Sequence, residues 1–146
     1  MVHIRVLLLD NFLVIWMLRL GIDIGGTKLE AALIGTDGLV MARKRIPTEA
    51  NLGCEHIVKR VGKLAKEVLG ESSIYKVGVG LPGSLSPKTG LLRNSNTVCL
   101  NGQPLKDLIE NELNHSIVLE NDANCFALAE SIMGAGKNYN NVFGLI

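Results

Sequence analysis

Alternating apolar and polar positions predict three consecutive strands in the first third of the chain. The expected strands are Leu18–Ile24, Leu29–Ile34 and Leu39–Ile46. Short runs of this kind, separated by turn residues, are typical of antiparallel hairpins. Asp37-Gly38, between the second and third runs, supplies the positive φ that a tight turn requires. Pro47 ends the third strand, because proline offers no N–H to the ladder.

From residue 57 onward the apolar positions predict helices that alternate with short buried strands. Ile57–Leu69 repeats at the spacing of one helical face, and Gly70 is placed to end that helix. The other expected elements are the strand Lys76–Leu81, a helix that begins at Pro104, the strand Ile117–Leu119, the helix Ala123–Met133 and the strand Val142–Ile146. This order predicts an α/β fold, in which a mixed sheet has an N-terminal hairpin pair on one side and crossover helices on the other.

Length and charge narrow the class of protein. A chain of 146 residues suffices for one domain with its own core. The net charge of +1 argues against a nucleic-acid-binding surface. The three cysteines lie far apart without the spacing of a metal site or a disulfide framework, which favours reduced thiols in the cytoplasm.

Residues 1–16 do not continue the pattern of the domain. Asp10 and Asn11 interrupt their apolar runs, so we expect no membrane-spanning helix. No small-residue cleavage site follows them, as a signal peptide would require. We therefore interpret residues 1–16 as an extension outside the native fold, which begins at Met17.

The connection between the first two strands carries candidate chemistry. Gly25 and Gly26 let the backbone approach an anion closely and offer it amide hydrogens. Thr27 adds a hydroxyl and Lys28 a cation, and Asp23 is placed to hold Mg²⁺ through water. The same residues also suit an ordinary hairpin with a Gly-Gly turn. Spacing alone leaves both interpretations open.

A second candidate segment, Glu120–Asn124, follows a strand and opens a helix. Asp122 is placed to cap that helix by accepting hydrogen bonds from its free amides. A carboxylate at the carboxyl end of a strand in an open α/β sheet also lies where ligands bind. There it can take the proton of a hydroxyl that attacks a phosphate. A cap and a general base both fit the spacing.

Between these segments lies a loop rich in small and amide side chains. It contains Gly80-Leu81-Pro82-Gly83-Ser84 and Asn94-Ser95-Asn96. Such groups suit a polyhydroxylated ligand, because each ligand hydroxyl needs both a donor and an acceptor. They suit an ordinary turn equally well.

Four stretches, taken in order, resemble the ROK family of sugar kinases and repressors. They are Gly21–Lys28, Gly78–Pro87, Leu100–Leu105 and Glu120–Ala127. The chain is most similar to the fructokinase-type branch of that family. The resemblance implies an actin-like ATPase (ribonuclease H-like) fold of two domains with an ATP site between them. It also implies a cytoplasmic enzyme that transfers phosphate from ATP, with Mg²⁺, to a hexose.

The resemblance further implies a role for individual residues. By this likeness Asp122 is the general base. The first phosphate loop is formed by Asp23, Gly25, Gly26, Thr27 and Lys28. The expected sugar contacts are Gly83, Ser84, Asn96 and Asn121.

The resemblance also divides the chain into parts. Residues 17–141 are expected to be the N-terminal domain, and residues 142–146 the first strand of a second domain. In the family a second phosphate loop and a zinc-binding cluster of His and Cys follow that strand. Because phosphoryl transfer needs both halves, we expect this chain alone to be inactive. The full-length protein is expected to be a homodimer with no nucleic-acid or membrane partner.

The sugar and the class of protein have alternatives. Asn121–Leu128 is equally similar to N-acetylhexosamine kinases, and glucokinases belong to the same family. Cys99 stands where fructokinase-type members often carry Trp. The family also contains DNA-binding repressors, but the apolar segment before Asp23 shows no helix-turn-helix pattern. A non-catalytic sugar-binding protein is the third alternative.

Overall fold

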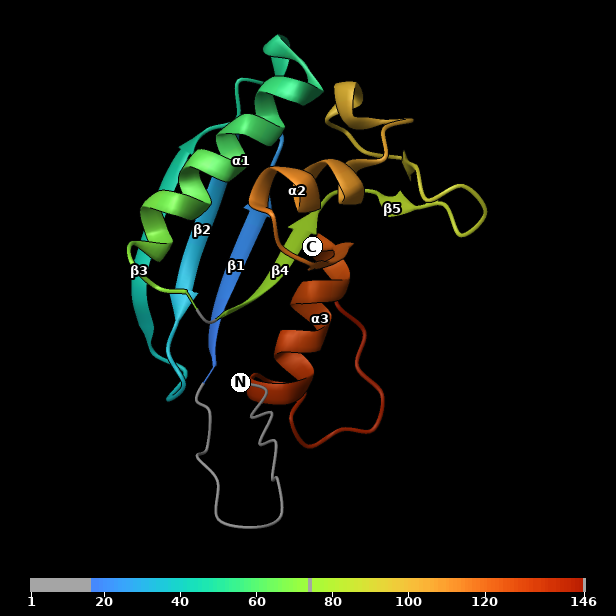
Figure 1. The fold of residues 1–146 in the computed structure, drawn as a ribbon. Helices are drawn as coiled ribbons and strands as arrows, with labels where there is room; N and C mark the ends of the chain where they lie inside the picture. Colours follow the sequence, from blue (N-terminus) through green and yellow to red (C-terminus); the bar gives the residue numbers. More distant parts are fainter. Residues whose placement is uncertain (1–16, 74, 146) are drawn as a thin grey trace.

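The computed structural model describes residues 17–73 and 75–145. Its main feature is a five-stranded sheet with the order β3-β2-β1-β4-β7. β1, β2 and β3 pair antiparallel, whereas β1, β4 and β7 run parallel (Figure 1). The strands are β1 Leu18–Ile24, β2 Lys28–Ile34, β3 Val40–Pro47, β4 Tyr75–Leu81 and β7 Ile117–Asn121. The predicted mixed sheet with an N-terminal hairpin pair is therefore confirmed.

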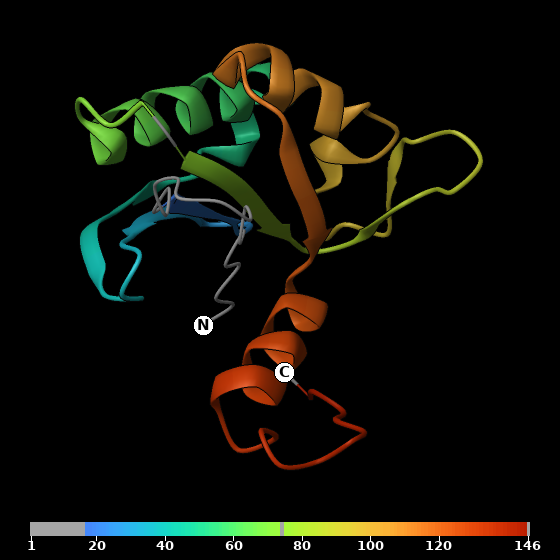
Figure 2. The same ribbon diagram turned by 60° about the horizontal axis from the view of Figure 1, so that its bottom comes forward.

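Helices lie on both faces of the sheet. α1 and α2 pack side by side on one face, and α3 lies on the other (Figure 2). The helices are α1 Cys54–Leu69, α2 Leu105–Leu113 and α3 Asp122–Met133. The remaining described elements are the small strands β5 Ser84–Leu85 and β6 Leu92–Arg93 and the 3₁₀ helices η1 Ala50–Leu52 and η2 Val98–Leu100.

The core lies between the sheet and the helices α1 and α2. Alternate residues of β1 point into it, and Leu20, Ile22 and Ile24 are almost fully buried. The buried side chains of α1 recur every three or four residues, as a helix packed on one face requires. They are Ile57, Val58, Val61, Leu64, Ala65 and Val68. Burying a large aliphatic side chain stabilises a fold by roughly 1.5–3 kcal/mol, so this layer holds the strands rigidly in place.

The observed elements differ from the predicted ones mainly at their ends and in the long loop. α1 begins at Cys54, three residues before the first repeating apolar position. The segment 82–103, expected to be a loop, contains β5, β6 and η2. Residues 142–145, expected to begin a strand, form none. A strand needs a neighbour for its backbone groups, and no described strand pairs with this stretch.

The predicted division into a domain of residues 17–141 and a second domain stays a prediction. The proposed extension, residues 1–16, lies outside the described residues. Within residues 17–73 and 75–145, no helix has both the length and the apolar character needed to cross a membrane.

The sheet face that carries α3 is only partly covered. Val118 of β7 points to this face and is 72% exposed. Leu128 and Met133 on α3 are also exposed, as is Phe143 in the segment that follows the helix. Exposed apolar side chains of this kind favour association between proteins.

We expect the 146-residue chain to self-associate through these side chains. Light scattering should give an average mass above that of one chain. The double change Val118→Thr with Leu128→Ser should lower it, because both side chains are exposed and their loss leaves the core intact. As a control, Leu52→Ser alters a comparably exposed side chain in η1 and should have little effect. A dilution-stable monomer of the unchanged chain would contradict this expectation.

Candidate functional site

The connection from β1 to β2 is a tight turn. The Gly25 N–H donates to the Lys28 carbonyl oxygen at 2.9 Å. A Cβ on Gly25 would lie 2.9 Å from that same oxygen, so only glycine fits there. Thr27 and Lys28 are exposed at the tip of the turn. The segment is therefore a hairpin in its backbone, and its exposed hydroxyl and ammonium groups leave it suited to an anion.

Asp23 and Asp122 lie at the carboxyl ends of β1 and β7, on either side of β4. The parallel register places Asp23 level with Gly80, and Gly80 level with Glu120. Gly80 leaves space between the two strand ends, because a Cβ there would approach to 4.0 Å from Asp23 Oδ1 and 3.6 Å from Cys125 Sγ. The two segments predicted separately from sequence thus meet at one edge of the sheet.

The pKa of the Asp23 carboxyl is raised above its ordinary value. Burial is the largest cause, followed by the negative charges of Asp122 and Glu30, and the positive charge of Arg45 opposes them. Burial combined with a like charge is an arrangement typical of functional sites. The geometry beside it is the register, which brings the ends of β1 and β7 to either side of Gly80.

The donor set at this edge fits a magnesium ion bound together with phosphates. Mg²⁺ is commonly held by one or two carboxylates, several waters and the phosphate oxygens of a substrate. Asp23 supplies such a carboxylate, and Asp122 lies within its electrostatic reach. Within the described residues, no group of three or more His, Cys, Asp or Glu side chains forms a complete metal cage. A water-mediated contact between Asp23 and Mg²⁺ stays a prediction.

Replacing Asp23 by Asn should stabilise the fold near neutral pH. The pKa of Asp23 is higher in the folded chain than in the unfolded one, so the folded state loses stability as the pH rises through that interval. The gain in thermal midpoint from Asp23→Asn should be largest near neutral pH and disappear below the ordinary value of 3.8. A loss of stability in Asp23→Asn at neutral pH would be the opposite result.

Asn121, rather than Asp122, caps α3. The Asn121 Oδ1 accepts hydrogen bonds from the N–H groups of Ala123 at 3.0 Å and Asn124 at 3.2 Å. Asp122 is the first residue of the helix, and its Oδ1 accepts from the Ala123 N–H at 2.9 Å. The cap that the sequence placed at Asp122 thus belongs to its neighbour. Helix capping alone does not explain a carboxylate at position 122.

Asn121 also ties α3 to the predicted sugar loop. Its Nδ2 donates to the Gly83 carbonyl oxygen at 2.9 Å. Gly83 has a φ of 104°, and a Cβ there would lie 2.7 Å from the Arg93 carbonyl oxygen. Asn121 therefore links α3 to this loop, and Gly83 allows a backbone conformation and a close approach that a side chain would prevent. Neither role was part of their prediction as sugar contacts. Their contact with a sugar stays a prediction.

Asn96 lies beside the predicted phosphate loop. A Cβ on Gly26 would lie 3.9 Å from Asn96 Oδ1. The chain around Asn96 is fixed by a reciprocal pair of hydrogen bonds between Ser95 and Asn101, both 2.9 Å long. The structure thus brings a predicted sugar contact next to a predicted phosphate contact. Ser84 is exposed in the short strand β5, and its role as a sugar contact stays a prediction.

The sequence pattern did not single out Thr97, which follows Asn96. Thr97 is only 3% exposed, and its Oγ1 has no hydrogen-bond partner among the described residues. The same oxygen would lie 3.5 Å from a Cβ on Gly26. A buried hydroxyl without a partner costs about 1–3 kcal/mol of folding stability, and this one lies beside the predicted phosphate loop. A threonine in a polar loop gives no sequence signal for this arrangement.

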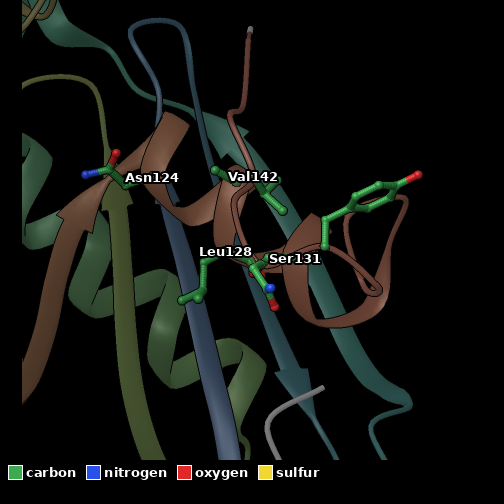
Figure 3. A pocket seen from close by; sticks show the side chains of 7 residues that line it. Asn124, Leu128, Ser131 and Val142 are labelled. Carbon is green, nitrogen blue, oxygen red and sulfur yellow. The ribbon is translucent and has the colours of Figure 1, made fainter.

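A separate hollow of about 480 Å³ runs along α3. It is lined by Asn124, Ala127, Leu128, Ser131, Tyr139, Asn140 and Val142. Figure 3 shows Asn124, Leu128 and Ser131 along the helix and Val142 on the segment that follows it. None of these residues was predicted to contact phosphate or sugar. The hollow thus contains none of the predicted site residues.

The two glycines of the turn should respond differently to alanine. Gly25→Ala should destabilise the fold by roughly 1–3 kcal/mol, because its Cβ would press on backbone at Lys28. Gly26→Ala should be tolerated, because its nearest neighbour would be the Thr97 Oγ1 at an ordinary contact distance of 3.5 Å. Urea unfolding of the two variants provides the comparison. Equal losses at both positions would show that the turn differs from the one described.

The sequence of this chain is similar to known families and proteins. Residues 19–146 match the model of the ROK family. The chain is 34% identical over 128 residues to the glucokinase of Thermotoga maritima, which covers 86% of this chain and 40% of that protein. It is 36% identical over 129 residues to the N-acetyl-D-glucosamine kinase of Aliivibrio fischeri, with 86% of this chain and 42% of that protein covered.

A solved structure shows the same likeness in three dimensions. The ROK family glucokinase from Streptomyces griseus, in complex with glucose and AMPPNP, matches with a TM-score of 0.73 at 29% identity. The match covers 83% of this chain and 38% of that chain. The predicted actin-like ATPase fold is thereby confirmed. The chain spans about two fifths of the length of these relatives.

Proposed function

Because the chain belongs to the ROK family, as its motifs predicted, we propose that it forms the part of an ATP-dependent sugar kinase that binds the ATP phosphates and the reacting sugar hydroxyl. One observation carries the proposal. Asp23 at the end of β1 and Asp122 after β7 approach each other beside the turn at Gly25–Lys28. An anion-binding turn next to a carboxylate that can take a proton is what phosphoryl transfer to an alcohol requires.

Asp122 is the proposed general base. It accepts the proton of the sugar hydroxyl while the sugar oxygen forms a bond to the γ-phosphorus of ATP. The bond from that phosphorus to the bridging oxygen breaks at the same centre, and ADP leaves. Asp122 is the first residue of α3, and the partial positive charge of a helix N-terminus favours a carboxylate there.

The turn between β1 and β2 is proposed to orient the phosphates. The Gly26 amide, the Thr27 hydroxyl and the Lys28 ammonium are its donors. Asp23 would hold Mg²⁺ through water, and a bound magnesium ion neutralises phosphate charge. Asn96, which lies against Gly26, is placed where the sugar and the phosphates meet.

We propose glucose or an N-acetylated hexosamine as the sugar, ahead of fructose. The relatives described above are named as glucokinase and N-acetyl-D-glucosamine kinase, whereas the fructose assignment depends on the motif resemblance alone. A panel of glucose, mannose, fructose and the N-acetylhexosamines tests this with the full-length protein, with ADP release as the measured signal. Turnover of fructose alone would overturn the ranking, and no turnover of any of these sugars would overturn the proposed activity.

Asp122→Asn should lower kcat of the full-length protein by roughly 100-fold or more, because a positioned general base contributes about 10²–10⁴ in rate. KM for the sugar should change little, since the amide keeps the shape and one acceptor oxygen. Asp107→Asn, in the first turn of α2, is the matched control and should keep wild-type kcat. Steady-state kinetics with ADP detection gives both constants. A normal kcat in Asp122→Asn would exclude this residue as the base.

A further inference from the structure

Thr48, the residue after β3, donates two hydrogen bonds to the backbone of the proposed phosphate loop, the turn at Gly25–Lys28. Its side chain is completely buried. Its Oγ1 donates to the Gly25 carbonyl oxygen at 2.7 Å, and its N–H donates to the Thr27 carbonyl oxygen at 2.9 Å. Both acceptors belong to the turn that is proposed to bind phosphate. No motif had drawn attention to Thr48, because the strand pattern ends at Pro47.

These two bonds fix the direction of the loop amides. The peptide unit is planar and trans, so the C=O of one residue points opposite to the N–H of the next. Holding the Gly25 C=O therefore sets the direction of the Gly26 N–H. Holding the Thr27 C=O sets the direction of the Lys28 N–H in the same way. By donating to these two carbonyl oxygens, Thr48 thus sets the direction of the Gly26 and Lys28 N–H groups.

Thr48 is itself fixed by its two neighbours. Glu49 is in the left-handed region, with φ 56° and ψ 46°, which costs a residue other than glycine of order 1–3 kcal/mol. Its Oε2 lies 2.7 Å from His56 Nε2 and accepts from Arg60 Nη1 at 2.9 Å. Arg60 Nε also donates to the Pro47 carbonyl oxygen at 2.9 Å. Pro47 and Glu49, on either side of Thr48, are therefore both anchored to α1.

We propose that Thr48 is a positioning residue for the phosphate loop and that Glu49, His56 and Arg60 fix its position. The proposal depends on the proposed function, because it takes the loop's ligand to be the phosphates of ATP. The Thr48 hydroxyl is not needed to fill space, since valine has the same shape. What only the hydroxyl supplies is the bond to Gly25, so its loss should affect the loop more than the fold.

The test compares Thr48→Val, Thr48→Ser and Thr36→Val in the full-length protein. Valine removes the hydroxyl and keeps the volume, serine keeps the hydroxyl, and Thr36 lies in the turn at the opposite end of β2. Amide hydrogen exchange of the peptide that covers residues 21–30 reports the loop directly. We expect exchange to be about two- to tenfold faster in Thr48→Val, the range that one hydrogen bond supports, and unchanged in Thr48→Ser and Thr36→Val.

Steady-state kinetics provides the second measurement. Thr48→Val should raise KM for ATP several-fold, leave KM for the sugar unchanged, and be rescued by serine. Unchanged exchange at residues 21–30 in Thr48→Val would overturn the proposal. So would faster exchange throughout the chain, which would mean a role in overall stability only. If the unchanged protein phosphorylates no sugar, the proposed function fails, and the exchange comparison still decides whether Thr48 holds the loop.

Discussion

The parallel pairing of β1 with β4 and of β4 with β7 is the constraint on which the site depends. It brings the carboxyl ends of three strands to one edge of the sheet, in a register that sets Asp23 level with Gly80 and Glu120. Residues nearly one hundred positions apart in the chain then share a single electrostatic environment. The buried layer of α1 and α2 maintains this register, because slipping a strand by one residue would turn its apolar side chains out of the core.

Several unfavourable features gather around this edge. Asp23 lies near like charges, Thr97 carries a buried hydroxyl without a described partner, and Glu49 has a left-handed backbone. Each lowers stability when considered alone. A concentration of such conflicts in one place is typical of a site selected for binding or chemistry rather than for stability.

Much of the fold could be predicted because burial follows local periodicity. The alternation in Leu18–Ile24 and the helical repeat in Ile57–Leu69 each correspond to one buried face. β5 and β6 could not be predicted, because two residues are too few to show an alternating pattern. The cap was assigned to Asp122 instead of Asn121, because the sequence pattern does not fix the first residue of a helix to within one position. Thr48 could not be predicted because its hydroxyl bonds a carbonyl 23 positions away, and no local pattern encodes such a contact.

The hydrogen bonds of Asn121 have a mechanical consequence. One side chain fastens the first turn of α3 through Oδ1 and the loop at Gly83 through Nδ2. α3 otherwise touches the rest of the described fold mainly through β7 and β4. One amide side chain is therefore shared between the start of the helix and the backbone of the loop at Gly83, so its replacement would remove a cap and a tether together.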